Sequence, residues 1–188
     1  MSDERWLVFG LGNPGDQYSL TRHNIGQIVV DYLTDSSSRT FSSHKSRTKV
    51  AEIKIGSHSV VVAKSQGYMN ESGGPARALA DFYKISPHHV ITIHDELDLP
   101  YSEMRIKFGG GDNGHNGVKS LTQHFGSPDF YRIRMGIGRP EHNPADYVLK
   151  PFSPAEMKAL EPFVERAAHA IDRLIEKGLE SAQQEFNK

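Results

Sequence analysis

Four polar segments of the chain contain the side chains that could do chemistry. They hold His23 near the start, Asn70 and Asp95 after two later apolar runs, and a glycine-rich stretch at 109–117. A histidine can accept a proton near neutral pH, and an aspartate can orient the ring and stabilise its charged form. The pairing of His23 with Asp95 therefore indicates a site that activates water for hydrolysis.

Each of these residues also has an ordinary structural explanation. Asp95 could cap a helix or form a turn, and Asn70 and Asn116 could cap the helices that follow them, the second over 117–124. The glycine stretch 109–117 could be a simple connection. A functional interpretation is favoured because these residues all lie at the ends of predicted strands.

Other chemistries are not supported by the spacing. Histidines and carboxylates lie close in sequence at 88–89 and 94–98, but there is no His-Glu-x-x-His, and neighbouring side chains alternate on an extended segment. Ser72 lacks the glycine that a nucleophilic serine motif needs two places earlier. Because the chain has no cysteine, thiolate metal sites and a cysteine nucleophile are excluded. The sequence predicts neither a metal nor a cofactor.

Three glycines near the start imitate a dinucleotide-binding motif. Gly10, Gly12 and Gly15 fit G-x-G-x-x-G directly after the apolar run 6–9. In a dinucleotide site the helix opens within those glycines, whereas here the helical pattern begins only near Ile25. We therefore predict no NAD or FAD, and we expect these glycines to form a tight turn that brings Asn13 into a cleft.

The elements that must position these residues alternate between strands and helices. Apolar runs at 6–9, 60–63, 90–93 and 133–137 predict strands, and 47–55 with 59–64 predicts an antiparallel hairpin. Helical periodicity appears at 25–33, at 76–83, and from Ser153 to a stop at Gly178. This pattern predicts an α/β fold in which a twisted mixed sheet lies in a single three-layer domain, flanked by helices, with a long C-terminal helix.

Length and charge narrow the class further. With 188 residues, 37% hydrophobic and 24% charged, the chain is long enough for one domain, which we place at 1–188. No segment has the length of a membrane span and the start lacks an apolar signal core, so we expect a cytoplasmic protein that does not bind a membrane. The net charge of −1 argues against general attraction to nucleic acid, but basic residues gather at 39–54 and 105–139.

Five motifs in order resemble the bacterial-type peptidyl-tRNA hydrolase family. They are Gly-Leu-Gly-Asn-Pro-Gly with Thr-Arg-His-Asn-Ile-Gly, Tyr-Met-Asn-Glu-Ser-Gly, His-Asp-Glu-Leu-Asp-Leu-Pro, Gly-Gly-Gly-Asp-Asn-Gly-His-Asn-Gly and Arg-Ile-Arg-Met-Gly-Ile-Gly-Arg-Pro. The match runs from about Leu7 to Pro140. It implies hydrolysis of the ester between a peptide and the terminal ribose of tRNA, which recycles tRNA from aborted translation without a covalent intermediate.

The resemblance also implies a role for individual residues. His23 would be the general base, Asp95 would orient it, and Asn13 would recognise an N-blocked substrate by both donating and accepting hydrogen bonds. Two basic residues would hold tRNA phosphates. The remaining positions match the substrate cleft, with His115 on a mobile rim formed with the preceding glycines. The cleft positions are Tyr18, Tyr68, Met69, Asn70, His115 and Asn116, and the basic positions are Lys107 and Arg134.

Peptidyl-tRNA is thus the expected partner of a monomeric enzyme. The rival hypothesis is an RNA-binding or translation-associated factor that keeps the cleft without turnover. The presence of His23, Asp95 and the asparagines Asn13, Asn70 and Asn116 favours the enzyme.

Overall fold

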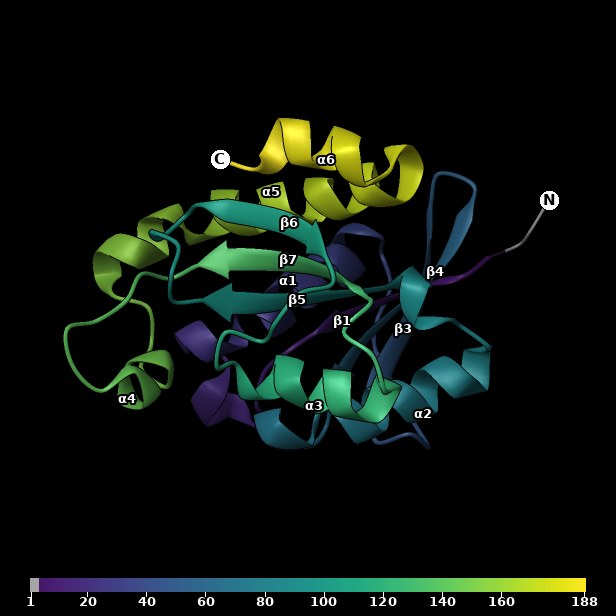
Figure 1. The fold of residues 1–188 in the computed structure, drawn as a ribbon, viewed down its shortest axis with the longest axis horizontal. Helices are drawn as coiled ribbons and strands as arrows, with labels where there is room; N and C mark the ends of the chain where they lie inside the picture. The colour runs from purple at the N-terminus through teal and green to yellow at the C-terminus, as the bar shows by residue number, and fades with distance from the viewer. Residues whose placement is uncertain (1–3) are drawn as a thin grey trace.

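A seven-stranded mixed sheet forms the centre of the computed structural model, which describes residues 4–188. The strand order is β2-β3-β4-β1-β5-β7-β6. Strands β4, β1, β5 and β7 run parallel to their neighbours within this group, whereas β2, β3 and β6 pair antiparallel. In Figure 1 the arrows of β5 and β7 point toward the side that carries α4, and β6 points the opposite way.

The strands and helices of the described residues follow an alternating order. The strands are β1 Trp6–Gly10, β2 Ser42–His44, β3 Thr48–Ile55, β4 His58–Ser65, β5 Val90–Glu96, β6 Met104–Phe108 and β7 Tyr131–Gly136. The α-helices are α1 Ile25–Ser36, α2 Gly73–Tyr83, α3 Asn116–Phe125, α4 Pro144–Val148, α5 Pro154–Lys177 and α6 Leu179–Phe186. Short 3₁₀ turns lie at Asp16–Tyr18, Arg22–Asn24, Met69–Glu71 and Pro87–His89. None of these helices is both long and apolar enough to cross a lipid bilayer.

Helices cover both faces of the sheet and produce three layers (Figure 1). On one face α1, α5 and α6 pack against the larger apolar core, and on the other α2 and α3 pack against the smaller one. Successive strand residues alternate between the two cores, as Val8 and Phe9 of β1 do. The central strands are therefore apolar on both faces, which is why they appear in the sequence as continuous apolar runs.

Of the three glycines near the start, only Gly15 has the role predicted for it, a tight turn. A Cβ on Gly10 would lie 2.3 Å from the carbonyl oxygen of Gly26, and one on Gly12 would lie 2.7 Å from the Gln27 side chain. Only Gly15 has a positive φ, at 101°. The prediction of a turn holds for Gly15, whereas Gly10 and Gly12 allow α1 to cross close over the end of β1.

Most predicted elements are confirmed, including the 47–64 hairpin and the long helix that ends at Gly178. The sequence analysis missed β2, β6, α4 and α6. In β6, Arg105 and Lys107 alternate with apolar residues, which was the available signal of a half-buried strand. Gly178, whose φ is 91°, ends α5, and α6 begins at the next residue. The polar stretch 138–143 is a loop, as predicted.

Candidate active site

The carboxyl ends of three parallel strands open into one cleft, with a volume of about 540 Å³. Segments that follow β1 and β4, the end of β5, the start of α3 and the helix α4 line it. Parallel strands end at the same edge, so residues far apart in sequence meet there. Nine of the predicted residues line the cleft: Asn13, Tyr18, His23, Tyr68, Met69, Asn70, Asp95, His115 and Asn116. Lys107 and Arg134 are not among the lining residues.

His23 and Asp95 are in direct contact, with no side chain between them. Asp95 is near the end of β5 and 4% exposed, and His23 is in the 3₁₀ turn just before α1. His23 Nδ1 lies 2.9 Å from Asp95 Oδ2 and 3.0 Å from Oδ1. An ionised carboxylate only accepts hydrogen bonds, so Nδ1 carries the proton and donates a hydrogen bond to Asp95. Nε2 is then the nitrogen with a free lone pair.

The two groups stabilise each other's charged form. Burial alone would lower the pKa of His23, but the charge of Asp95 and the hydrogen bond to it outweigh burial and raise the pKa above its ordinary value of 6.5. Burial alone would raise the pKa of Asp95, but His23 and His115 together hold that pKa well below its usual range. Asp95 is consequently ionised at any pH at which the protein would work.

His115 is a second histidine bound to the same carboxylate. Its Nε2 lies 2.8 Å from Asp95 Oδ1, while its Nδ1 accepts the backbone N–H groups of Gly117 at 3.1 Å and Val118 at 3.3 Å. His115 is thus the N-cap of α3, and the alternative that Asn116 caps this helix is wrong. Because Nδ1 is an acceptor, the single proton of the neutral ring is on Nε2 and is donated to Asp95.

His23, Asp95 and His115 are close enough to be considered as metal ligands, since their donor atoms lie within 4.8 Å of one another. A metal on His115 Nε2 would require that nitrogen to lose its proton. The proton would move to Nδ1 and face the N–H groups of Gly117 and Val118. The donor set therefore fits a hydrogen-bonded network better than a metal centre.

His94, the residue before Asp95, is buried and does not line the cleft. Its Nδ1 lies 2.9 Å from the Asp95 carbonyl oxygen and so donates to it. Burial, together with the nearby His115, lowers the pKa of His94 to about 3, so this ring stays neutral. The predicted alternation of side chains holds for His94 and Asp95, whereas Glu96 at the end of β5 lines the cleft together with Asp95.

Asn13 is held by a reciprocal contact that the sequence analysis missed. Asn24 Oδ1 accepts the Asn13 N–H at 2.9 Å, and Asn24 Nδ2 donates to the Asn13 carbonyl at 2.9 Å. The Asn13 side-chain oxygen accepts the Met69 N–H at 2.8 Å. Because that oxygen already accepts a hydrogen bond within the protein, Asn13 does not both donate to and accept from a ligand as expected. Its Nδ2 is the group left to donate to a ligand. The motif Thr-Arg-His-Asn was the available signal for Asn24.

The segment after β4 supplies one wall of the cleft. Met69 is 5% exposed and belongs to the smaller core. Tyr18 and Tyr68 meet edge to face, with ring centroids 6.4 Å apart. Asn70 is exposed within the turn Met69–Glu71, and α2 begins only at Gly73. The alternative that Asn70 caps the following helix is therefore wrong.

The basic pair predicted for phosphates lies on adjacent strands beside the glycine stretch. Arg134 on β7 is not a free cation, because its Nε and Nη2 both lie 3.0 Å from Glu96 Oε1. Burial, with the neighbouring charges of Arg134 and Arg132, lowers the pKa of Lys107. Glu96 also accepts from Asn113 Nδ2 at 2.6 Å, which ties the glycine stretch to the end of β5. Glu96 and Asn113 line the cleft but were not predicted.

Helix α4 forms a further wall that the sequence analysis did not identify. Pro144, Ala145, Val148 and Leu149 present apolar side chains to the cleft. The available signal was the pair Asn143-Pro144, since proline is favoured in the first turn of a helix. The cleft is thus lined by the apolar side chains of this segment as well as by polar asparagines and histidines.

The fold and the site together define an α/β enzyme in which a buried carboxylate orients a histidine at the carboxyl edge of a parallel sheet. Residues 7–188 match the family model described as peptidyl-tRNA hydrolase. The chain therefore belongs to the peptidyl-tRNA hydrolase family and is a hydrolase.

Individual relatives agree with this assignment. A peptidyl-tRNA hydrolase of Pseudarthrobacter chlorophenolicus is 47% identical over 98% of this chain and 96% of its own length. One of Streptomyces coelicolor is 47% identical over 97% of this chain and 94% of its own. The crystal structure of the Acinetobacter baumannii peptidyl-tRNA hydrolase superposes with a TM-score of 0.92 at 33% identity, covering all of this chain and 96% of the other.

Proposed function

We propose that the chain cleaves the ester between the peptide and the terminal ribose of N-blocked peptidyl-tRNA by a direct attack of water activated by His23. The observation that carries this proposal is the contact of His23 Nδ1 with the buried Asp95, which leaves Nε2 as the basic nitrogen of a cleft-lining ring. Hydrolysis of peptidyl-tRNA follows from the family, and the steps below are our inference from the geometry.

In the first step, His23 Nε2 takes a proton from water while the water oxygen bonds to the ester carbonyl carbon. The resulting imidazolium is stabilised by Asp95, and the negative charge forms on the former carbonyl oxygen. Cleft-lining amide groups of Asn70 and Asn116 are available to donate to the substrate there. In the second step, the ester C–O bond breaks and the ribose oxygen receives the proton from His23. The products are free tRNA and a peptide with a carboxyl group.

A covalent intermediate is not needed. Among the described residues that line the cleft there is no serine, threonine or cysteine side chain that could serve as the nucleophile. An ester is more reactive than an amide, so a positioned water with a general base suffices.

Selection of a blocked substrate is the role we propose for Asn13. Its free Nδ2 can donate to a peptide carbonyl next to the ester-linked residue, a group that free aminoacyl-tRNA does not have. The apolar wall formed by α4 would contact peptide side chains, and Tyr18 and Tyr68, which also line the cleft, would contact the substrate as well. Lys107, with Arg134 beside it, would hold tRNA phosphates.

We further propose that the chain acts as a monomer in the cytoplasm, as one domain of residues 1–188.

The test is deacylation of N-acetyl-aminoacyl-tRNA compared with unblocked aminoacyl-tRNA, without added metal. We expect the blocked form alone to be hydrolysed.

His23→Ala should lower kcat by about 10²- to 10⁴-fold while tRNA binding persists. His58→Ala is the matched control, because His58 is the first residue of β4, at the other end of that strand from the cleft. If the blocked substrate is stable in the presence of the wild-type protein, the proposed function is wrong; full activity of His23→Ala would remove this residue as the base.

A further inference from the structure

Like Arg132 on β7, Arg22, the residue before His23, is a buried arginine. It is in the same 3₁₀ turn as His23, is only 7% exposed, and does not line the cleft. Burying a guanidinium costs free energy unless its hydrogen bonds are supplied within the protein. The contacts of Arg22 must therefore offset the cost of burying its charge next to the turn of His23.

Those contacts all lead to the segment that begins with α4. Arg22 Nη2 lies 2.7 Å from Glu156 Oε1, and Nη1 donates to the Tyr147 carbonyl at 3.2 Å. The guanidinium also lies over the Tyr147 ring, 4.1 Å from its centre. One planar group thus joins the His23 turn to α4 and to the first turn of α5 simultaneously.

The partners of Arg22 are themselves fixed. Glu156 Oε1 also accepts the Ser153 N–H at 2.8 Å, and Ser153 Oγ accepts the Glu156 N–H at 3.1 Å, so the carboxylate is part of the capping box of α5. Tyr147 donates its hydroxyl to the Ile137 carbonyl. Arg22 is therefore held against groups that have little freedom to move.

Backbone contacts run alongside this link. The Arg22 N–H donates to the Lys150 carbonyl at 3.1 Å, and the Phe152 N–H donates to the Leu20 carbonyl at 3.1 Å. Thr21 and Pro151 form an isolated antiparallel bridge between these two bonds. The chain immediately before His23 is thus paired with the chain immediately after α4.

We propose that Arg22 is a positioning residue, which ties the turn of His23 to α4 and α5 so that the base meets Asp95 in its productive geometry. This inference rests on the proposed function, since it assigns Arg22 a part in the same reaction. Arg22 does not contact the substrate. It acts by limiting the positions that His23 can take relative to Asp95 and to the α4 wall, because a displacement of about 1 Å can cost about 10²-fold in rate.

The test separates positioning from charge balance with three variants. Arg22→Lys keeps a positive charge for Glu156 but lacks the fork that reaches Tyr147 as well. Arg22→Met with Glu156→Gln removes both charges, so that no buried carboxylate is left without a partner. Arg173→Met is the matched control: Arg173 lies on the same helix α5, far along the chain from the His23 turn, and the substitution breaks its ion pair with Glu185 of α6.

Two readouts are needed, the pKa of the His23 ring from an NMR titration and kcat/KM with the blocked substrate. We expect Arg22→Lys and the double variant to lower the His23 pKa toward 6.5, because the contact with Asp95 loosens, and to lower kcat/KM at least about ten-fold. Arg173→Met should change neither. An unchanged His23 pKa in the folded double variant would overturn the proposal, whatever the activity. A wild-type protein that fails to hydrolyse the substrate would instead refute the proposed function, and the NMR titration would still test Arg22.

Discussion

At the scale of single residues, the site depends on which atoms carry protons. Two histidines donate to one carboxylate, and only His23 keeps a lone pair for the cleft, because the Nδ1 of His115 is engaged by the N–H groups of α3. Asp95 is therefore the acceptor that orients His23, and His115 holds that carboxylate in place by donating to it. The second histidine keeps Asp95 ionised without competing as a base.

This arrangement predicts the pH dependence of the reaction. The charge of Asp95 raises the pKa of His23 despite burial, and protonated His23 cannot accept a proton, so kcat/KM should fall as the pH drops through a pKa above 6.5. Asp95→Asn removes that charge, leaving burial as the main influence. The acid limb should then move to lower pH while the rate falls by about 10²- to 10⁴-fold. A pH–rate profile of both proteins checks this, and an acid limb that stays in place in Asp95→Asn would contradict it.

At the scale of elements, the site is formed where α1 crosses close to the ends of β1 and β5. A Cβ on Gly26 would lie 2.1 Å from the Ile93 carbonyl oxygen and 2.7 Å from the Leu11 backbone nitrogen. These are backbone atoms, so they cannot rotate away as a side chain could. The packing fixes the direction in which α1 leaves the turn of His23.

We therefore expect Gly26→Ala to lower the free energy of unfolding by about 3 kcal/mol or more. Gly74→Ala is a suitable control. It is also near a helix start, but its Cβ would meet only His124 ring atoms, the nearest at 3.7 Å. It should be neutral or stabilise by up to about 1 kcal/mol. Urea unfolding of the two variants measures both effects, and equal stabilities would show that the close crossing at Gly26 is not a constraint.

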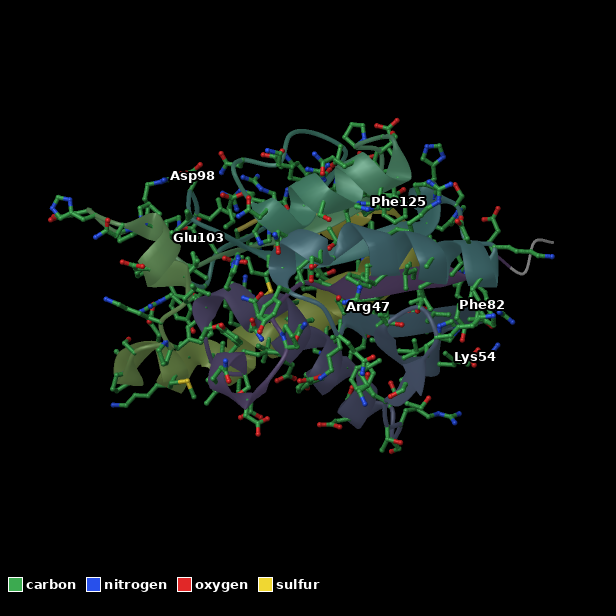
Figure 2. The ribbon with its side chains drawn as sticks, turned by 90° about the horizontal axis from the view of Figure 1, so that it is seen from below. Arg47, Lys54, Phe82, Asp98, Glu103 and Phe125 are labelled. Carbon is green, nitrogen blue, oxygen red and sulfur yellow. The ribbon has the colours of Figure 1, made fainter. Side chains whose placement is uncertain are left out.

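At the scale of the whole molecule, the charge distribution decides how tRNA can be held. The net charge is −1, so attraction to a polyanion must come from a local group of basic residues. That group lies beside the glycine stretch, and the paired charge of Arg134 leaves Lys107 as the main free cation predicted there. Asp98 marks this region, because its carboxylate accepts a hydrogen bond from Asn113 of the glycine stretch. Figure 2 shows Asp98 at the opposite end of the molecule from Phe82 and Lys54.

Binding of tRNA should accordingly weaken only modestly with salt. We expect a plot of log affinity against log salt concentration to have a slope of about −1 to −2, as for one or two phosphate contacts. Lys107→Ala should make that slope less negative by about one, whereas Lys54→Ala at the other end should leave it unchanged. Equilibrium binding at several salt concentrations measures the slopes. An unaltered slope in Lys107→Ala would remove this residue from the phosphate site.

The sequence by itself determined the main elements and nine of the residues that line the cleft. Runs such as 6–9 and 90–93 are apolar because their strands are buried on both faces, and this property can be recognised without coordinates. Strands of the same direction end at one edge, so His23, Asn70 and Asp95 could be expected to meet. The edge strand β6 and the short helix α4 contain no such apolar run. The signal of β6 is the alternation of apolar residues with Arg105 and Lys107, and that of α4 is the pair Asn143-Pro144.

Only the tertiary structure decided how the atoms of these residues are used. The hydrogen bond of His115 to Asp95, that of the Asn13 side-chain oxygen to Met69 and the pairing of Arg134 with Glu96 join residues 20, 56 and 38 positions apart in the chain. The same is true of Arg22, whose carboxylate partner Glu156 lies 134 positions further on. A sequence pattern reports which side chains are present and which face they share. Whether a nitrogen or oxygen is free for a substrate depends on contacts that form only when distant segments pack together.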